Sequence, residues 1–278
     1  MQVCVTIDEV RDALRGAERP LGAVLTMGAL HDGHLALVRR ARAECKTVAA
    51  TIYVNPTQFG DARDLDTYPR PMQDDLAVLR REGVDVVLVP TDAEIYPEGF
   101  GSWVEPGAIA ERLEGEHRPG HFRGVCTVVL KLFNILGPNV SYFGQKDAQQ
   151  VLVIRKMIAD LALPVDIVSV PTVRERDGLA MSSRNGSLGN DERRAARVLY
   201  RALTRASDLA ADGVHDANAL RNAVHATLAE EPLAQVDYVS IAHPETLEEL
   251  QTLDGPALAS LAVRIGQTRL IDNVVIGE

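Results

Sequence analysis

Short apolar runs and longer amphipathic stretches follow one another along residues 1–172. The apolar runs predict buried strands at residues 22–27, 47–54, 84–90, 139–144 and 165–171. The stretches between them, with apolar residues every three or four positions, predict helices at residues 32–44, 72–83, 124–136 and 148–161. A capping-box pattern, Thr6 followed by Glu9, predicts one more helix that ends near Gly16.

Strands that alternate with helices and are apolar throughout favour a parallel sheet covered on both faces. We therefore expect an α/β fold with a Rossmann-like, doubly wound sheet over residues 1–172. Ligands of such sheets bind beyond the carboxyl ends of the strands. Four polar segments are predicted there: TMGALHDGH (26–34), YVNPTQFG (53–60), YFGQKD (142–147) and the segment that follows VSVP at residue 171.

The pattern changes after residue 172, where the chain becomes polar and loop-like. Two helices are predicted at about residues 190–212 and 216–230, followed by short strands. Gly266 and Gln267 lie between two of these strands and predict a hairpin turn. We expect residues 173–278 to form a smaller α+β domain that carries the segment SSRN (182–185).

Charge and cysteine content narrow the possible partners. The chain of 278 residues has 39 acidic and 29 basic residues, a formal net charge of −10, which disfavours nucleic acid or an anionic membrane as the main partner. Three widely spaced cysteines without a CxxC motif, and a start without a signal-peptide pattern, predict a reduced, cytoplasmic protein. The most apolar long segment, residues 125–136, is too short to span a bilayer.

Two histidines three positions apart, His31 and His34, are the first candidate for chemistry. If a helix begins near Asp32, both lie on one side of its first turn, where free backbone N–H groups and the helix dipole favour an anion. Gly28 and Gly33 allow a phosphate to approach the backbone closely. A metal half-site or a buried core histidine is the alternative interpretation.

Hydroxyls and cations in two further segments suit a polyphosphate. Ser182, Ser183 and Arg184 follow one another on a predicted flexible loop that could close over a triphosphate. Lys146 adds an ammonium just after a predicted strand. The alternatives are an ordinary polar turn and a solvated surface lysine.

Uncharged amides and one basic segment suit a small polar substrate. Asn55, Gln58 and Gln150 can both donate and accept hydrogen bonds and would recognise substrate hydroxyls, or they cap helices. Arg118 and His121 would anchor a carboxylate or phosphate, or order their own loop.

Two adjacent acids are the weakest candidate. Asp74 and Asp75 could help to hold Mg²⁺, although the helix dipole alone favours acids in a first helical turn. No GxGxxG or Walker motif and no Ser/His/Asp set is found, which removes the dinucleotide-binding, P-loop and hydrolase classes as first choices.

Several of these segments together resemble the pantoate–β-alanine ligase family. The resemblance spans about residues 21–276 and is carried by TMGALHDGH, NPTQF, YPR, GHFRGV, FGQKDAQQ, PTVRERDGLAMSSRN and TRLIDN. That family belongs with the nucleotidylyltransferases and class I aminoacyl-tRNA synthetases. Their HxGH and KMSKS signatures are similar to residues 31–34 and 181–184 here.

The resemblance implies an ATP-dependent condensation of pantoate with β-alanine through a pantoyl-adenylate, by a Mg²⁺-dependent homodimer. It implies catalytic roles for His31, His34 and Lys146. It implies ATP contacts for Met27, Gly28, His31, His34, Gly144, Lys146, Asp147, Val173, Met181, Ser182, Ser183 and Arg184. It implies pantoate or β-alanine contacts for Asn55, Gln58, Arg118, His121 and Gln150.

Two positions depart from the family pattern. Leu25 stands where the family has proline before TMGALH, which puts the rigidity of that loop in doubt, and Ala148 stands where tyrosine is common. Other interpretations remain: a related adenylate-forming enzyme with a different acceptor, or an ATP-binding regulatory or nucleic-acid-binding module without turnover.

Overall fold

The computed structural model describes residues 1–60 and 62–277, and the contacts within the chain divide it into two compact units. The first unit contains Met1–Gln145 and Gln149–Pro171. The second contains Lys146–Ala148 and Thr172–Glu278. No described helix combines the length and the apolar character that crossing a bilayer requires.

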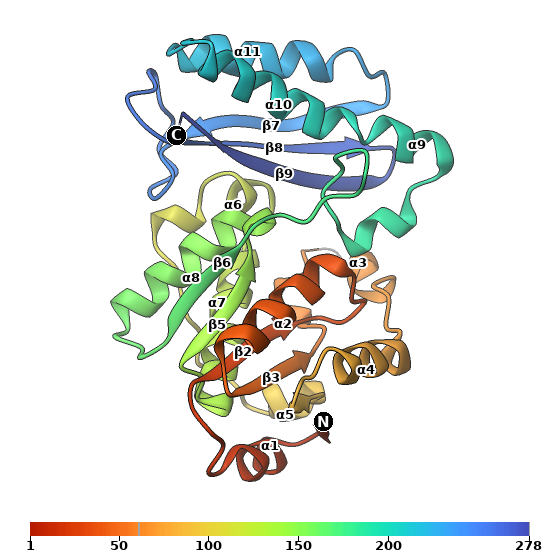
Figure 1. Ribbon diagram of the computed structural model, residues 1–278, viewed down its shortest axis with the longest axis vertical. Coiled ribbons are helices and arrows are strands. Elements are labelled where there is room, and N and C mark those ends of the chain that lie inside the picture. Colours follow the sequence, from red (N-terminus) through yellow and green to blue (C-terminus); the bar gives the residue numbers. More distant parts are fainter. Residues whose placement is uncertain (61, 278) are drawn as a thin grey trace. The chain divides into compact units, whose positions relative to one another are not determined.

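A parallel six-stranded sheet forms the centre of the first unit (Figure 1). Its strands are β1 (Gln2–Cys4), β2 (Leu21–Thr26), β3 (Thr47–Ile52), β4 (Val86–Leu88), β5 (Val140–Gly144) and β6 (Asp166–Val170), in the order β1-β4-β3-β2-β5-β6. From β2 the chain adds β3 and β4 on one side and then β5 and β6 on the other. The direction of winding therefore reverses between β2 and β5, where sheets of this kind bind ligands.

Helices cover both faces of this sheet, as the alternating pattern predicts. Helices α1 (Ile7–Leu14), α7 (His121–Leu136) and α8 (Ala148–Asp160) pack on one face. Helices α2 (Asp32–Glu44) and α4 (Met72–Arg81) pack on the other. Successive side chains of a strand point to opposite faces, so Ala23 joins the first core and Val24 the second. This explains why the strands are apolar without alternation.

The connections contain short elements that the sequence pattern does not predict, because three to five residues are too few for a helical period. They are η1 (Pro56–Gln58), α3 (Ala62–Asp66), α5 (Asp92–Ile95), η2 (Ala108–Ala110), α6 (Glu114–His117) and η3 (Gln145–Asp147).

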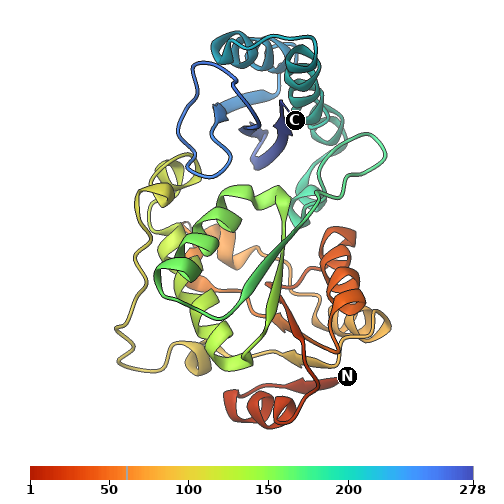
Figure 2. The same cartoon turned by 60° about the vertical axis from the view of Figure 1, so that its left-hand side comes forward.

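The second unit is α+β, as expected. An antiparallel sheet, β7 (Ala234–Ala242), β8 (Ala257–Ile265) and β9 (Thr268–Ile276), is covered on one face by α10 (Val198–Ala211) and α11 (Ala217–Leu228) (Figure 2). The hairpin between β8 and β9 turns at residues 266–267, as predicted. The short η4 (Ser183–Ser187) and α9 (Asn190–Ala195) precede α10.

The prediction of one continuous helix over residues 190–212 was wrong. Helix α9 ends at Ala195, and the chain tightens before α10 begins. There the Arg197 N–H donates to the Arg194 carbonyl and the Leu199 N–H to the Ala196 carbonyl, both three residues back. Neither glycine nor proline marks this break, so the composition of the segment does not reveal it.

Candidate functional site

The two histidines cap the helix that they introduce. Helix α2 begins at Asp32, as predicted, and His31 is its N-cap residue. The His31 Nδ1 atom accepts a hydrogen bond from the Gly33 N–H at 3.1 Å, and the His34 Nδ1 atom accepts from the His31 N–H at 3.3 Å. The two rings lie with their centroids 4.1 Å apart. Both imidazoles are therefore held by the backbone at the start of one helix.

This capping determines which ring nitrogen can donate. A neutral imidazole whose Nδ1 accepts a hydrogen bond carries its proton on Nε2. In the neutral state His31 and His34 thus each have an Nε2–H donor. The Gly33 N–H is already used by His31, so the helix start offers fewer backbone donors to an anion than the sequence interpretation assumed. The imidazoles themselves are the stronger candidates for phosphate contact.

A buried carboxylate holds the loop between β2 and α2. Asp75, in the first turn of α4, is 3% exposed and accepts the N–H groups of Ala29 and Leu30, each at 2.8 Å. Gly28 and Ala29 both adopt left-handed conformations, with φ of +82° and +50°. A Cβ atom at Gly28 would lie 2.9 Å from Asp75 Oδ2. Asp75 thereby fixes the strained turn that precedes His31.

These contacts bear on the proposed metal pair. Both carboxylate oxygens of Asp75 are occupied by backbone N–H groups, and Asp74 is exposed on the helix surface. Within residues 1–60 and 62–277 there is no group of three or more His, Cys, Asp or Glu side chains arranged to hold a metal ion. Asp74 and Asp75 thus belong to no such group, and the observed role of Asp75 is to bind the backbone of the β2–α2 loop.

Asn55 organises the loop that carries Gln58. It is 1% exposed, and its Nδ2 group donates to Gln58 Oε1 at 3.0 Å and to the Gly124 carbonyl at 3.3 Å. Its Oδ1 atom accepts from the Tyr96 hydroxyl at 2.9 Å. Burial raises the pKa of Tyr96, which keeps that hydroxyl a donor. Asn55 is also the N-cap residue of η1, so the capping role is observed for it. The Gln58 Nε2 atom lies 3.1 Å from Met27 Sδ.

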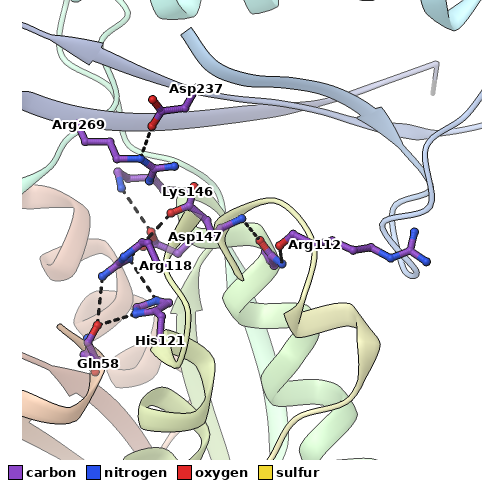
Figure 3. Close-up of polar contacts among 10 residues, drawn as sticks. Gln58, Arg112, Arg118, His121, Lys146, Asp147, Asp237 and Arg269 are labelled. Carbon is purple, nitrogen blue, oxygen red and sulfur yellow. Dashed lines mark hydrogen bonds and ion pairs between the residues drawn. The ribbon is translucent and has the colours of Figure 1, made fainter. Parts of the chain in front are cut away.

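Arg118 and His121 hold the backbone of the same loop (Figure 3). The Gln58 carbonyl accepts from His121 Nδ1 at 2.8 Å and from Arg118 at 3.3 Å. Because that carbonyl can only accept, His121 carries a proton on Nδ1, and its Nε2 atom accepts from the Arg118 guanidinium at 3.3 Å. Both residues therefore order the loop that carries Gln58: they hold its backbone carbonyl, and Asn55 holds its side chain.

Lys146 lies in η3, directly after β5. Its Nζ atom is 3.4 Å from Asp147 Oδ1, and its side chain is 18% exposed. Its carbonyl accepts a hydrogen bond from Asn273 Nδ2 at 2.9 Å. Gly144 is the last residue of β5, and Gln150 is half-buried in the first turn of α8.

Hydrogen bonds connect the two sides of the segment that leads to the SSRN sequence. The Met181 N–H donates to the Val173 carbonyl at 2.9 Å, which closes a short hairpin. Ser182 is the N-cap of η4, where its hydroxyl accepts from the Arg184 N–H at 3.2 Å, and Ser183 begins that turn. Hydrogen bonds within the segment therefore hold the backbone of these residues.

The predicted site residues are divided between the two units. The first unit contains Met27, Gly28, His31, His34, Asn55, Gln58, Asp74, Asp75, Arg118, His121, Gly144 and Gln150. The second contains Lys146, Asp147, Val173, Met181, Ser182, Ser183 and Arg184.

Sequence reasoning missed the residues that hold these side chains in place. They are Tyr96 and Gly124 behind Asn55, and Arg174, Asp272 and Asn273 behind the SSRN segment and Lys146. Arg174 belongs to PTVRERDGLAMSSRN and the last two to TRLIDN, so the motifs contained them. Their roles depend on contacts between distant segments and are not visible in the spacing.

Comparison with known proteins identifies the family of the chain. The sequence model of the pantoate-beta-alanine ligase family matches residues 2–275. A pantothenate synthetase of Roseiflexus sp. (strain RS-1) is 58% identical over 276 residues, which cover 99% of each chain.

Two solved structures are similar over almost the whole chain. The crystal structure of pantothenate synthetase from Thermus thermophilus has a TM-score of 0.95 and 46% identity, covering 99% of both chains. A pantoate-beta-alanine ligase from Francisella tularensis, complexed with beta-gamma ATP and beta-alanine, has a TM-score of 0.82 and 36% identity over 99% of this chain and 97% of that one. With a family match from residue 2 to residue 275 and these relatives, the chain belongs to the pantoate–β-alanine ligase family.

Proposed function

We propose that this chain joins pantoate to β-alanine in two steps driven by ATP. In the first step a carboxylate oxygen of pantoate attacks the α-phosphorus of ATP, the bond to the bridging oxygen breaks, and pyrophosphate leaves. In the second, the neutral amine of β-alanine attacks the acyl carbon of the pantoyl-adenylate, AMP leaves and the amine loses a proton. The ligands named for the Francisella tularensis relative support ATP and β-alanine as substrates.

The paired imidazoles are the observation that carries this proposal. A pantoate carboxylate is ionised at neutral pH, so the first step needs no general base. Catalysis then depends on positioning and on stabilising charge at the phosphoryl oxygens. His31 and His34, each with Nδ1 engaged by the backbone, can donate Nε2–H to those oxygens from a fixed position.

The cationic and hydroxyl groups of the second unit complete the proposed ATP contacts. Lys146 and Arg184 would neutralise phosphate charge, and Ser182 and Ser183 would donate hydroxyl hydrogen bonds. The backbone groups proposed for the nucleotide are those of Met27, Gly28, Gly144, Asp147, Val173 and Met181.

The amide groups of the first unit are proposed to hold pantoate. Gln58 and Gln150 would recognise its hydroxyls and carboxylate, because amides both donate and accept. Asn55, Arg118 and His121 act on Gln58 through the contacts described above. We assign them a positioning role in addition to any substrate contact.

Mg²⁺ enters this proposal only as part of the ATP substrate. Asp75 is committed to the backbone of Ala29 and Leu30, so no step of the proposed reaction depends on a cation held by these acids. Magnesium in nucleotide sites is often held largely by phosphates and water.

The oligomeric state and the cellular location of this chain are also proposals. We propose a homodimer, which light scattering of the purified protein tests directly. We also propose a cytoplasmic location, supported by three cysteines that are all free and buried.

The test is AMP release by the purified protein with ATP and Mg²⁺, comparing pantoate alone, β-alanine alone and both together. We expect multiple turnovers and formation of pantothenate only with both substrates. Turnover with another acid in place of pantoate would indicate a related adenylate-forming enzyme. Absence of AMP with every combination, from folded protein, would indicate a binding module.

A further inference from the structure

Two adjacent residues of β9 contact both cationic segments of the second unit. Asp272 and Asn273 are buried, at 2% and 5% exposed. Asp272 binds Arg174, at the base of the hairpin of residues 173–181 that leads to SSRN and is called the SSRN hairpin below. Asn273 binds the backbone of Lys146. Neither residue belongs to the set to which the proposed function assigns substrate contact.

Arg174 and Asp272 form a two-pronged ion pair. The Arg174 guanidinium donates to both carboxylate oxygens of Asp272, at 2.6 and 3.0 Å, and the arginine side chain is 16% exposed. The guanidinium also donates to the Asn273 carbonyl, at 3.2 Å. The guanidinium also lies 3.9 Å from the ring centroid of Tyr200 on α10. Paired bonds of this kind fix orientation as well as distance.

The same guanidinium holds the hairpin that leads to Ser182. Arg174 donates to the Gly178 carbonyl at 3.1 Å, across the turn of the hairpin, and it pairs with Ala180 as an isolated bridge. Hydrogen bonds also connect the hairpin to η4: Asn185 Nδ2 donates to Glu175 Oε1 at 2.9 Å and to the Ala180 carbonyl at 3.1 Å. The position of the serines thus depends on where Arg174 is bound.

Asn273 connects β9 to the Lys146 turn. Its side-chain amide donates to the Lys146 carbonyl at 2.9 Å, and its own N–H donates to Asp272 Oδ1 at 2.8 Å. Lys146 follows β5 in η3, a single turn of three residues. A buried side-chain bond to its carbonyl therefore restricts the backbone from which the ammonium extends.

We infer that Asp272 and Asn273 are positioning residues for catalysis, which set the SSRN hairpin and the Lys146 turn in one fixed arrangement before ATP binds. This inference rests on the proposed function, since it assumes that these two segments contact the nucleotide. Preorganised donors stabilise a transition state without reorganising during the reaction. The consequence is that loss of either residue should slow adenylation although the proposed function assigns neither a contact with the substrates.

The first test measures backbone order without substrates. In Asp272→Asn, hydrogen exchange of the Met181 and Glu175 amides, which close the hairpin, should rise about tenfold or more. In Asn273→Ala the exchange around residues 146–148 should rise while the hairpin changes little. Unchanged exchange in both variants overturns the inference.

The second test measures the rate of AMP release. Asp272→Asn should lower kcat about tenfold or more and leave KM for β-alanine within about twofold, since the proposed function assigns no contact with the acceptor to these segments. The matched control is Glu249→Gln, which breaks an ion pair of the same unit whose arginine, Arg221, is 15% exposed. The control should keep the wild-type kcat and wild-type hairpin exchange. A loss of kcat in the control equal to that of Asp272→Asn would mean general destabilisation and would overturn the inference.

Two further variants separate this inference from the proposed function. Lys146→Ala and Arg184→Ala remove the proposed phosphate contacts, and normal AMP release by both would refute that function for these residues. If they lose activity while Asp272→Asn loosens the hairpin and keeps the wild-type kcat, the inference alone fails. Should Asp272→Asn not fold, Arg174→Lys, which keeps the charge and loses the paired bonds, takes its place in both tests.

Discussion

Asp75 binds the backbone of Leu30, 45 residues earlier in the chain: its Oδ1 atom accepts the Leu30 N–H at 2.8 Å. The acid comes from the first turn of α4 and the amide from the loop that ends β2. Because the other carboxylate oxygen binds the neighbouring Ala29 N–H, the side chain closes a turn with two consecutive left-handed residues. The histidine that caps α2 follows this turn at once.

Asp75→Asn should disrupt that turn and leave the magnesium dependence unchanged. An asparagine offers one acceptor oxygen, so one of the two N–H groups faces an amide donor and loses its partner. A buried donor without a partner costs about 1–3 kcal/mol of unfolding free energy. We expect that loss in urea unfolding, together with a fall of about tenfold or more in the rate of AMP release.

The control for this prediction is Glu82→Gln, at the other end of α4. Glu82 also makes two charge-assisted bonds, to Arg39 at 2.7 and 2.8 Å, but they lie on the protein surface. That variant should change stability by at most about 1 kcal/mol and leave turnover intact. If Asp75→Asn instead raises the Mg²⁺ concentration needed for half-maximal activity, the carboxylate is a metal ligand and our assignment is wrong.

Substitutions at His34 can separate capping from catalysis. His34→Asn keeps an acceptor near the position of Nδ1 and removes the Nε2 donor, whereas His34→Gln places an amide near the position of Nε2. We expect His34→Asn to fold normally and to lose about 10²-fold in adenylation rate, the usual scale for one transition-state donor. His34→Gln should recover part of that rate. Pyrophosphate release in a single turnover measures both, and near-normal adenylation by His34→Asn would refute the role of the donor.

The main elements of the fold could be predicted because burial dictates them. Strands β2 to β6 are apolar runs of a sheet covered on both faces, and each was predicted within a few residues. The edge strand β1 was missed, since it has three residues, two of them exposed. The break between α9 and α10 was missed for another reason: hydrogen bonds three residues back replace the α-helical ones there, and neither glycine nor proline marks the place.

The candidate site could be predicted in part. The spacing of His31 and His34 indicated one helical turn, and α2 begins at the expected residue. That both rings cap the helix was missed, although positions N-cap and N3 are those of a capping box. The partner of Asp75 is a backbone amide in another segment, and no pattern of side chains along a sequence encodes such a contact.

Gly124→Ala should destabilise the protein although alanine is the better helix former. A Cβ atom at this position of α7 would lie 2.4 Å from the Thr57 carbonyl oxygen and 2.8 Å from the Gln58 nitrogen, both backbone atoms. Alanine gains about 1 kcal/mol of helix propensity over glycine. The added methyl group would force η1 away from α7, and overpacking of this kind costs about 1–3 kcal/mol. Because the clash is with backbone atoms, which cannot move aside as a side chain can, we place the cost toward the upper end. We expect a net loss in urea unfolding and a raised KM for pantoate.

Gly107→Ala is the matched control, because a Cβ atom there meets nothing within 4 Å and the residue has a φ of −75°. Its stability and its KM for pantoate should remain those of the wild type. An equal change in both variants would contradict the steric explanation.

Acid should weaken the SSRN hairpin through Asp177. Arg193 donates to both carboxylate oxygens of Asp177, at 2.8 and 3.1 Å, and these bonds hold the pKa of that carboxyl below its ordinary value of 3.8. A lowered pKa in the folded state means that the pair stabilises the fold above pH 3.8 and that this contribution is lost as the pH falls through the folded value.

Asp177→Asn should therefore be less stable than the wild type at neutral pH, by about 1 kcal/mol or less because the pair is partly exposed to solvent. The difference in unfolding free energy should shrink as the pH falls below 3.8 and vanish once Asp177 is protonated in the folded wild type. Urea unfolding of both proteins across that range measures it. A difference that stays constant with pH would show that the variant acts through packing and not through the charge.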